Sequence, residues 1–320
     1  MFGVAFSQLA ILIFISLGGQ STVPLGMPPG PEDPIMAQFA PQKCLLYSTW
    51  SSTVTPDPSQ NVTERWMAQP EIVETFDRLK LATRQMSQTG DAGEDAINQV
   101  AFKLAERCLS QSVGFYVSKI KFDDFTLSVE GGALIDLGSN ARELMSEITL
   151  AMKDLAVGEG ITIGAANYSG LDCWTISADQ TALKSTLTWG LIRDQYLAIT
   201  MGDREMQRLL GNLLTDAPQW LVEMRNDLPV ARVSSVTRID MSGCLDCFFD
   251  FLEEADPRSV EEIKEILKTL GISALRQVGW VSGLDNHGFI CRGLYRIEGE
   301  PEGLMGLMAG EPLKPVAFGK

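Results

Sequence analysis

Hydrophobic residues between Ser185 and Leu214 first alternate with polar or small residues and then change to a helical spacing. Two runs, 187–191 and 196–201, repeat every second residue and flank the polar turn 193–195. This pattern predicts a β-hairpin. Methionine and leucine residues then recur at three- and four-residue intervals. They predict a helix that has Asp203 as its N-cap.

The same hairpin-and-helix pattern recurs along most of the chain. Because consecutive strands are joined by tight turns and the helices lie between hairpins, the strands should pair antiparallel. The sequence therefore predicts an α+β fold: an antiparallel sheet built from repeated β-hairpin–helix units, with helices packed on one face. We expect further hairpins over 113–137, 161–176 and 273–297, a strand over 230–241, and helices over 94–109, 140–155, 243–254 and 259–270.

The N-terminal residues have the pattern of a secretory signal. An apolar run, 9–17, is followed by small residues, although no Lys or Arg precedes it. The run is shorter than the ~20 residues that span a bilayer. We expect residues 1–20 to be a signal peptide, with an uncleaved anchor or a misassigned start as the alternatives. The predicted order is then a Pro/Gly-rich linker over 21–40, an α+β domain over 41–310 and a tail over 311–320, with the domain either single or divided into two sub-modules that meet near residue 225.

Three features together resemble an exported bacterial domain of unknown function, number 3352, whose relatives are uncharacterised secreted proteins. They are the segment 41–47 (PQKCLLY), the segment 187–199 of the hairpin that precedes Asp203, and a late series of glycines at Gly271, Gly283, Gly288 and Gly303. The resemblance implies a repeated α+β fold and export to the periplasm or the extracellular space. It implies no activity. Relatives often continue further, which leaves open whether the chain is truncated at Lys320.

Charge and composition limit the possible partners. The chain has 41 Asp and Glu against 26 Lys and Arg, a formal charge of −15. Such a field repels phosphate backbones, so we expect no nucleic acid partner. We also expect no integral membrane span after signal cleavage. The sole histidine, His287, lies in a predicted turn, and the chain carries no nucleophile signature that could use it. No metal or cofactor is expected.

Cys244 and Cys247 form the one motif with a chemical precedent. The pair follows a predicted strand and opens a helix, where thioredoxin-like thiols lie. However, neither Trp nor Pro flanks it, and a zinc site would need a second Cys-x-x-Cys. Helical spacing also places the two thiols on one face with Phe248 and Phe251. We therefore expect buried structural thiols or a local disulfide, with redox chemistry as the alternative.

These observations favour an exported cell-envelope protein that binds or scaffolds an unidentified envelope or extracellular protein or ligand without catalysis. The first alternative is a thiol–disulfide oxidoreductase that uses Cys244 and Cys247. The second is a hydrolase whose carboxylates are scattered through the sequence.

Overall fold

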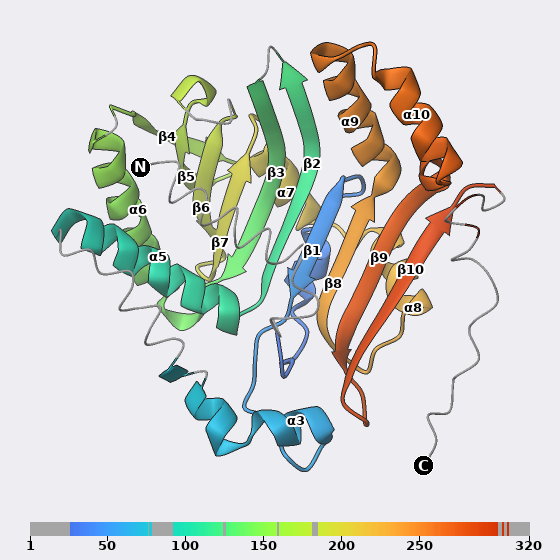
Figure 1. Ribbon diagram of the computed structural model, residues 1–320. Coiled ribbons are helices and arrows are strands. Elements are labelled where there is room, and N and C mark those ends of the chain that lie inside the picture. The colour runs from blue at the N-terminus through green and yellow to red at the C-terminus, as the bar shows by residue number, and fades with distance from the viewer. Residues whose placement is uncertain are drawn as a thin grey trace.

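One antiparallel sheet of ten strands, in the order β10-β9-β8-β1-β2-β3-β7-β6-β5-β4, organises the molecule (Figure 1). The computed structural model describes residues 26–75, 77–78, 92–123, 126–158, 160–180, 185–299, 303 and 306. The strands are β1 (Leu46–Trp50), β2 (Val113–Asp123), β3 (Thr126–Asp136), β4 (Ile163–Tyr168), β5 (Leu171–Ile176), β6 (Leu187–Ile192), β7 (Tyr196–Met201), β8 (Arg232–Asp240), β9 (Leu275–Leu284) and β10 (Phe289–Ile297).

Helices lie between the hairpins as the sequence pattern predicts. They are α2 (Pro34–Gln38), α3 (Val62–Met67), α5 (Ala92–Ser110), α6 (Ala141–Gly158), α7 (Glu205–Asn212), α8 (Gln219–Asp227), α9 (Met241–Ala255) and α10 (Val260–Thr269), with short 3₁₀ turns at Gly138–Asn140, Ala178–Gln180 and Ile272–Ala274. Of these, α2 and α8 are additional helices that the sequence pattern does not predict. The α+β class and the antiparallel hairpins are confirmed.

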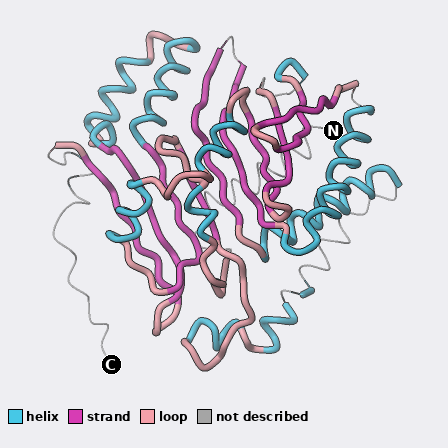
Figure 2. The backbone as a smooth tube through the Cα atoms, turned by 180° about the vertical axis from the view of Figure 1, so that it is seen from behind, coloured by secondary structure: helices cyan, strands magenta, loops and turns pink. Residues whose placement is uncertain are grey.

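Helices cover both faces of the sheet, so the prediction that they pack on one face is wrong. On β2, Tyr116 belongs to one buried cluster and its neighbour Phe115 to the other. Neighbouring residues of a strand point to opposite faces, so the two clusters lie on opposite sides of the sheet. Helices α5 and α6 pack on the Phe115 side, the front in Figure 1, whereas α2, α7 and α8 pack behind (Figure 2). The strands are apolar on both faces, and each face needs its own cover.

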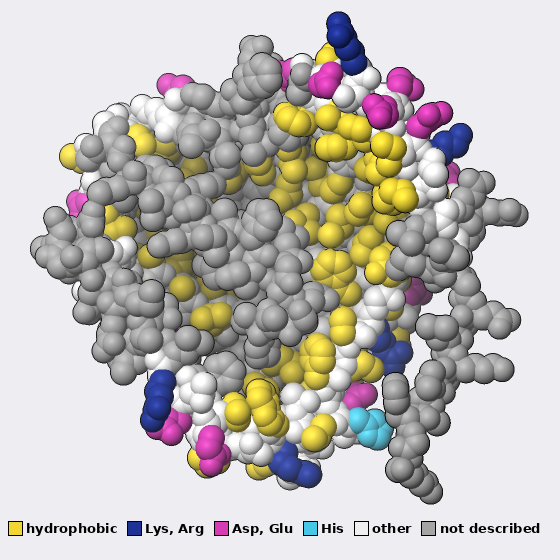
Figure 3. Space-filling model, viewed as in Figure 1, with side chains coloured by type: hydrophobic (Ala, Val, Ile, Leu, Met, Phe, Trp, Pro, Cys, Tyr) yellow, Lys and Arg dark blue, Asp and Glu magenta, His cyan; other side chains and the backbone are white. Residues whose placement is uncertain are grey.

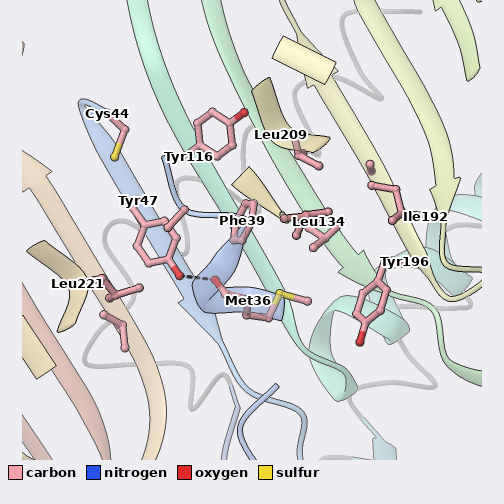
Figure 4. Close-up of a cluster of buried hydrophobic side chains, with 14 of the residues drawn as sticks. Met36, Phe39, Cys44, Tyr47, Tyr116, Leu134, Ile192, Tyr196, Leu209 and Leu221 are labelled. Carbon is pink, nitrogen blue, oxygen red and sulfur yellow. Dashed lines mark hydrogen bonds between the residues drawn. The ribbon is translucent and has the colours of Figure 1, made fainter. Parts of the chain in front are cut away.

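The segment predicted as a Pro/Gly-rich linker is instead part of the core from residue 26 onward. Asp33 caps α2 by accepting a hydrogen bond from the Ile35 N–H at 3.0 Å, and Pro34 takes the first helical position. Phe39 is wholly buried behind the sheet, and the Tyr47 hydroxyl donates to the Met36 carbonyl at 2.6 Å (Figure 4). Composition indicated a spacer, but a few large apolar side chains are enough to dock the segment.

The chain before and after residue 225 contributes to the same sheet. Strand β1 lies between β2 and β8 and pairs with both, so the hairpins on either side of that position share a strand. The predicted signal peptide, residues 1–20, and the predicted tail, residues 311–320, lie outside the described residues. No helix within the described ranges is both long and apolar enough to cross a membrane.

Candidate functional site

A row of five apolar side chains crosses the front of the sheet, one from each of five neighbouring strands. The register pairs Val117 with Leu46, Leu46 with Ile239, Ile239 with Val278, and Val278 with Tyr295. Paired residues of antiparallel strands place their side chains on the same face, so the five form one continuous line.

The next row of the same face contains a tryptophan. Trp280 pairs with Thr237, which pairs with Ser48, which in turn pairs with Phe115. Phe115 belongs to the cluster under α5 and α6, so this is the face that those two helices cover on the other half of the sheet. We call the row Val117, Leu46, Ile239, Val278 and Tyr295, together with Trp280, the open face.

Within the described parts of the chain, α5 and α6 do not extend over the open face. Helix α9 packs beside it against β2, β8 and β9, and all residues of the open face except Tyr295 are half-buried. Leu46 packs against the edge of the front cluster, but the other five residues belong to neither buried cluster. Tyr295 is 55% exposed. Figure 3 shows apolar side chains gathered on the front of the molecule where α9, β8 and β9 lie. Contiguous apolar surface of this kind usually marks a place where something binds.

Helix α9 extends the open face upward. It begins where β8 ends, with the Asp240 carboxylate accepting a hydrogen bond from the Gly243 N–H at 3.2 Å as its N-cap. Its sequence, MSGCLDCFFDFLEEA, is rich in Phe and Leu. No side chain between residues 241 and 254 is fully buried, and Phe248 is 42% exposed. The helix therefore adds apolar surface that the protein itself only half covers.

The part of the border that α9 forms is acidic. Asp246, Asp250, Glu253 and Glu254 are exposed on α9, and the helix has no Lys or Arg. In Figure 3 acidic side chains gather along the upper border of the apolar area, with basic side chains among them. One basic group lies close to α9, the ammonium group of Lys264, 5.4 Å from the centre of the Phe249 ring. A low-dielectric surface beside an excess of carboxylates attracts cations and repels anions.

Cys244 and Cys247 lie on the side of α9 that contacts the sheet. The Cys244 thiol lies 4.0 Å from the Leu45 carbonyl oxygen and the Cys247 thiol 3.5 Å from that of Ile120. All six cysteines lie in the described part of the chain, and none of them forms a disulfide there. The pKa of Cys244 is raised to about 11, mainly by burial and to a smaller extent by the Asp240 carboxylate. Burial also raises the pKa of Cys247. Both thiols are therefore protonated at neutral pH, which disfavours nucleophilic attack.

His287 is exposed in the turn between β9 and β10, as its sequence context predicts. The backbone N–H groups of His287 and Gly288 donate to the Asp285 carboxylate at 2.7 and 3.0 Å. These bonds hold the pKa of Asp285 below its usual range. Gly288 has φ 143° and packs against Thr63, whose hydroxyl accepts a hydrogen bond from the Phe289 N–H. The turn docks the last hairpin against α3.

Two buried carboxylates were not singled out as candidates from the sequence. Glu64 bonds the Asn61 amide at 2.7 Å and Arg232 at 2.8 Å, and Glu205 bonds the Tyr116 hydroxyl at 3.0 Å and Arg208. Asn61 and Glu64 had the spacing of a capping box, but no sequence signal indicated a distant arginine. Both carboxylates are fully partnered, so they hold elements together.

A small cavity lies behind the sheet, beside α2. It has a volume of about 50 Å³ and is lined by residues of α2, β1, β8 and α8, including Met36, Tyr47, Leu221 and Arg225. This volume suits one or two water molecules and is far below that of a site for an organic substrate. A second, more open hollow of about 300 Å³ also lies beside α2, where Glu32 pairs with Arg225 and Asp33 accepts a hydrogen bond from the Tyr196 hydroxyl. These polar groups already have partners within the protein, so the open face is the stronger candidate for a functional site.

Comparisons with known proteins add little to this geometry. No protein-family model matches the chain, so membership of the domain-of-unknown-function family stays a prediction. No curated protein matches it. Among solved structures the chain is similar to crystal form III of TP0453, with a TM-score of 0.37 and 9% identity over 84% of this chain and 81% of that one. A similarity this low transfers neither fold nor function.

Proposed function

We propose that this chain is an exported, non-catalytic binding protein that receives the apolar surface of an envelope or extracellular partner protein on its open face. The proposal rests on the row of apolar side chains across five strands. Of these side chains only Leu46 packs against a buried cluster. Burying such surface against a partner stabilises a complex by about 25 cal/mol per Å² before the costs of association.

Export rests on the apolar run at residues 9–17, which lies outside the described residues. Sequencing the N-terminus of the mature protein tests it. We expect the mature chain to begin between about residues 19 and 24. An intact Met1 on protein recovered from the cytoplasm would overturn export, although it would leave the binding proposal standing.

The alternative function, thiol–disulfide exchange by Cys244 and Cys247, has weaker support. Such an enzyme needs an attacking thiolate, which requires a thiol pKa near or below neutral pH. Here burial moves the pKa of Cys244 the other way, to about 11. We expect the folded protein not to accelerate the reduction of insulin by dithiothreitol. Acceleration that Cys244→Ala removes would favour the enzyme over the binding protein.

Nile red, a neutral apolar dye, tests whether the open face is accessible. Folded protein should enhance its fluorescence. A Val278→Thr/Tyr295→Ser variant should lose at least half of that enhancement, because it makes the row polar while nearly preserving volume at residue 278. Leu214→Ser is the matched control, since Leu214 is 87% exposed on the loop after α7. Equal fluorescence from all three proteins would overturn the proposed site.

A further inference from the structure

The proposed function leaves open what kind of partner surface fits the open face. Two features of the structure decide this: the shape of the layer that covers the rest of the same face, and the charge of the border.

The front layer of the molecule is helical where it is complete. Leu144 and Ile148 of α6 and Cys108 of α5 pack over the front of β2, β3, β6 and β7. The open face continues this surface of the same sheet across β1, β8, β9 and β10, each hydrogen-bonded to the next. A helix laid on twisted strands buries a stripe of side chains spaced three and four residues apart. The element that would complete the layer is an amphipathic helix.

The border selects the charge of that helix. Helix α9 contributes four exposed carboxylates and no basic residue beside the apolar surface. Helix α10 adds Glu261, Glu262 and Glu265 against Lys264 and Lys268. The whole chain carries −15. A second copy of this chain would bring two acidic borders together, and an anionic bilayer would be repelled. A helix with lysines or arginines on its polar side would instead gain attraction.

We propose that the open face binds an amphipathic helix with a basic polar side, supplied by a partner protein. The apolar stripe of that helix lies on Ile239, Val278, Trp280 and Tyr295, and its basic residues face the carboxylates of α9. This inference rests on the proposed function, since it needs an accessible open face.

Two labelled peptides of about 18 residues test the proposal by fluorescence anisotropy. Both carry the same leucine stripe; one has lysine and the other glutamate on its polar side, each long enough to be helical when bound. We expect the lysine peptide to bind at least about tenfold more tightly, and its affinity to fall as salt screens the carboxylates. Val278→Thr/Tyr295→Ser should abolish binding, whereas Leu214→Ser should not alter it.

A charge variant separates the border from the apolar row. Asp246→Asn/Asp250→Asn/Glu253→Gln removes three exposed carboxylates and leaves the apolar surface intact. We expect it to lose the preference for the lysine peptide, with an affinity about tenfold weaker at low salt. An unchanged preference in this variant would overturn the role of α9, and circular dichroism shows whether each variant is folded.

The remaining outcomes distinguish this inference from the proposed function. Equal binding of both peptides would overturn the proposal of a basic helix and leave the open face standing. Binding of neither peptide by a protein that still enhances Nile red fluorescence would have the same meaning. Binding to phosphatidylglycerol or phosphatidylcholine vesicles that Val278→Thr/Tyr295→Ser removes would identify a lipid surface instead. Concentration-dependent dimers by light scattering that the same variant removes would identify a second copy. Failure of both peptides and Nile red would overturn the proposed function itself.

Discussion

Glu64 shows how a single buried charge can join distant parts of the chain. Its side chain is 1% exposed and pairs with Arg232, whose side chain is 37% exposed and also donates to the Pro29 carbonyl at 3.2 Å. The carboxylate therefore connects α3, β8 and the N-terminal segment. No local pattern predicts such a bond, because the partners are 168 residues apart.

Replacing Glu64 should destabilise the fold. Glu64→Ala leaves Arg232 and the Asn61 amide without their acceptor, and we expect a loss of about 2–4 kcal/mol in the free energy of unfolding, less than for a fully buried pair because Arg232 is partly solvated. Urea denaturation measures it. Glu74→Ala is the control: Glu74 pairs with Arg78 on the surface, and its loss should change stability by less than about 0.5 kcal/mol. Equal effects would contradict the anchoring role.

The thiols should label in the order of their burial. With a pKa of about 11, two units above the ordinary 9.0, Cys244 has a thiolate fraction at pH 7 about a hundredfold lower than in the unfolded chain. We expect iodoacetamide to modify it correspondingly more slowly in the native protein than in urea. Cys291 is exposed and should react first, and the buried Cys44, Cys108 and Cys173 should react last. Rapid labelling of Cys244 in folded protein would restore the redox alternative.

Stability should fall in alkali. Burial raises the pKa of Cys44 and of Cys108 from 9.0 to about 12. The native state therefore holds these protons more tightly than the unfolded state, so their contribution is complete below pH 9 and is lost as the pH rises toward 12. In a reducing buffer, the urea midpoint should be constant from pH 7 to 8.5 and lower at pH 10. Cys44→Ala/Cys108→Ala should lessen the decrease; a midpoint that rises with pH would contradict the assignment.

At the scale of elements, the α2 segment is where composition and structure disagree most. Pro and Gly predict an extended linker, but Phe39 packs between Tyr47 and Tyr116, with ring centroids 5.7 and 5.8 Å away. Gly114 lies beneath the ring, and a Cβ there would meet Phe39 at 2.4 Å. The segment is thus fitted to the sheet by close packing that a count of residue types does not reveal.

Truncating Phe39 tests whether this segment belongs to the core. Phe39→Ala should cost about 3–5 kcal/mol, because it removes a wholly buried ring from between two others. Thermal and urea unfolding measure the loss. Val62→Ala, at a site 61% exposed, is the matched control and should change stability by less than about 0.5 kcal/mol. A Phe39→Ala protein as stable as the control would return the segment to the status of a linker.

For the whole molecule, the position of β1 makes the two halves of the chain interdependent. Leu197 precedes residue 225 and lies in the front cluster, whereas Val281 follows residue 225 and lies in the cluster behind the sheet. Each is replaced by alanine in a separate variant. Because β1 pairs with both β2 and β8, we expect each variant to lower the midpoint of one shared unfolding transition. Tryptophan fluorescence and circular dichroism should give coincident curves. Two separate transitions, each sensitive to one variant, would indicate two sub-modules that meet near residue 225.

Local patterns along the chain predicted the elements of this fold, because alternation and helical spacing are properties of neighbouring residues. The hairpins at β6–β7 and β9–β10 and the left-handed Gly271 after α10 follow from them. Even so, Asp203 does not cap α7 as expected: its carboxylate accepts from the Thr186 hydroxyl at 2.5 Å, a partner 17 residues away.

Only the tertiary structure decided how those elements share surfaces. It placed helices on both faces and inserted β1 between β2 and β8. It also aligned Val117, Leu46, Ile239, Val278 and Tyr295 in one row. Each of these residues is an ordinary apolar strand position in its own segment. Their alignment depends on strand order and register between segments far apart in sequence, which periodicity within one segment does not encode.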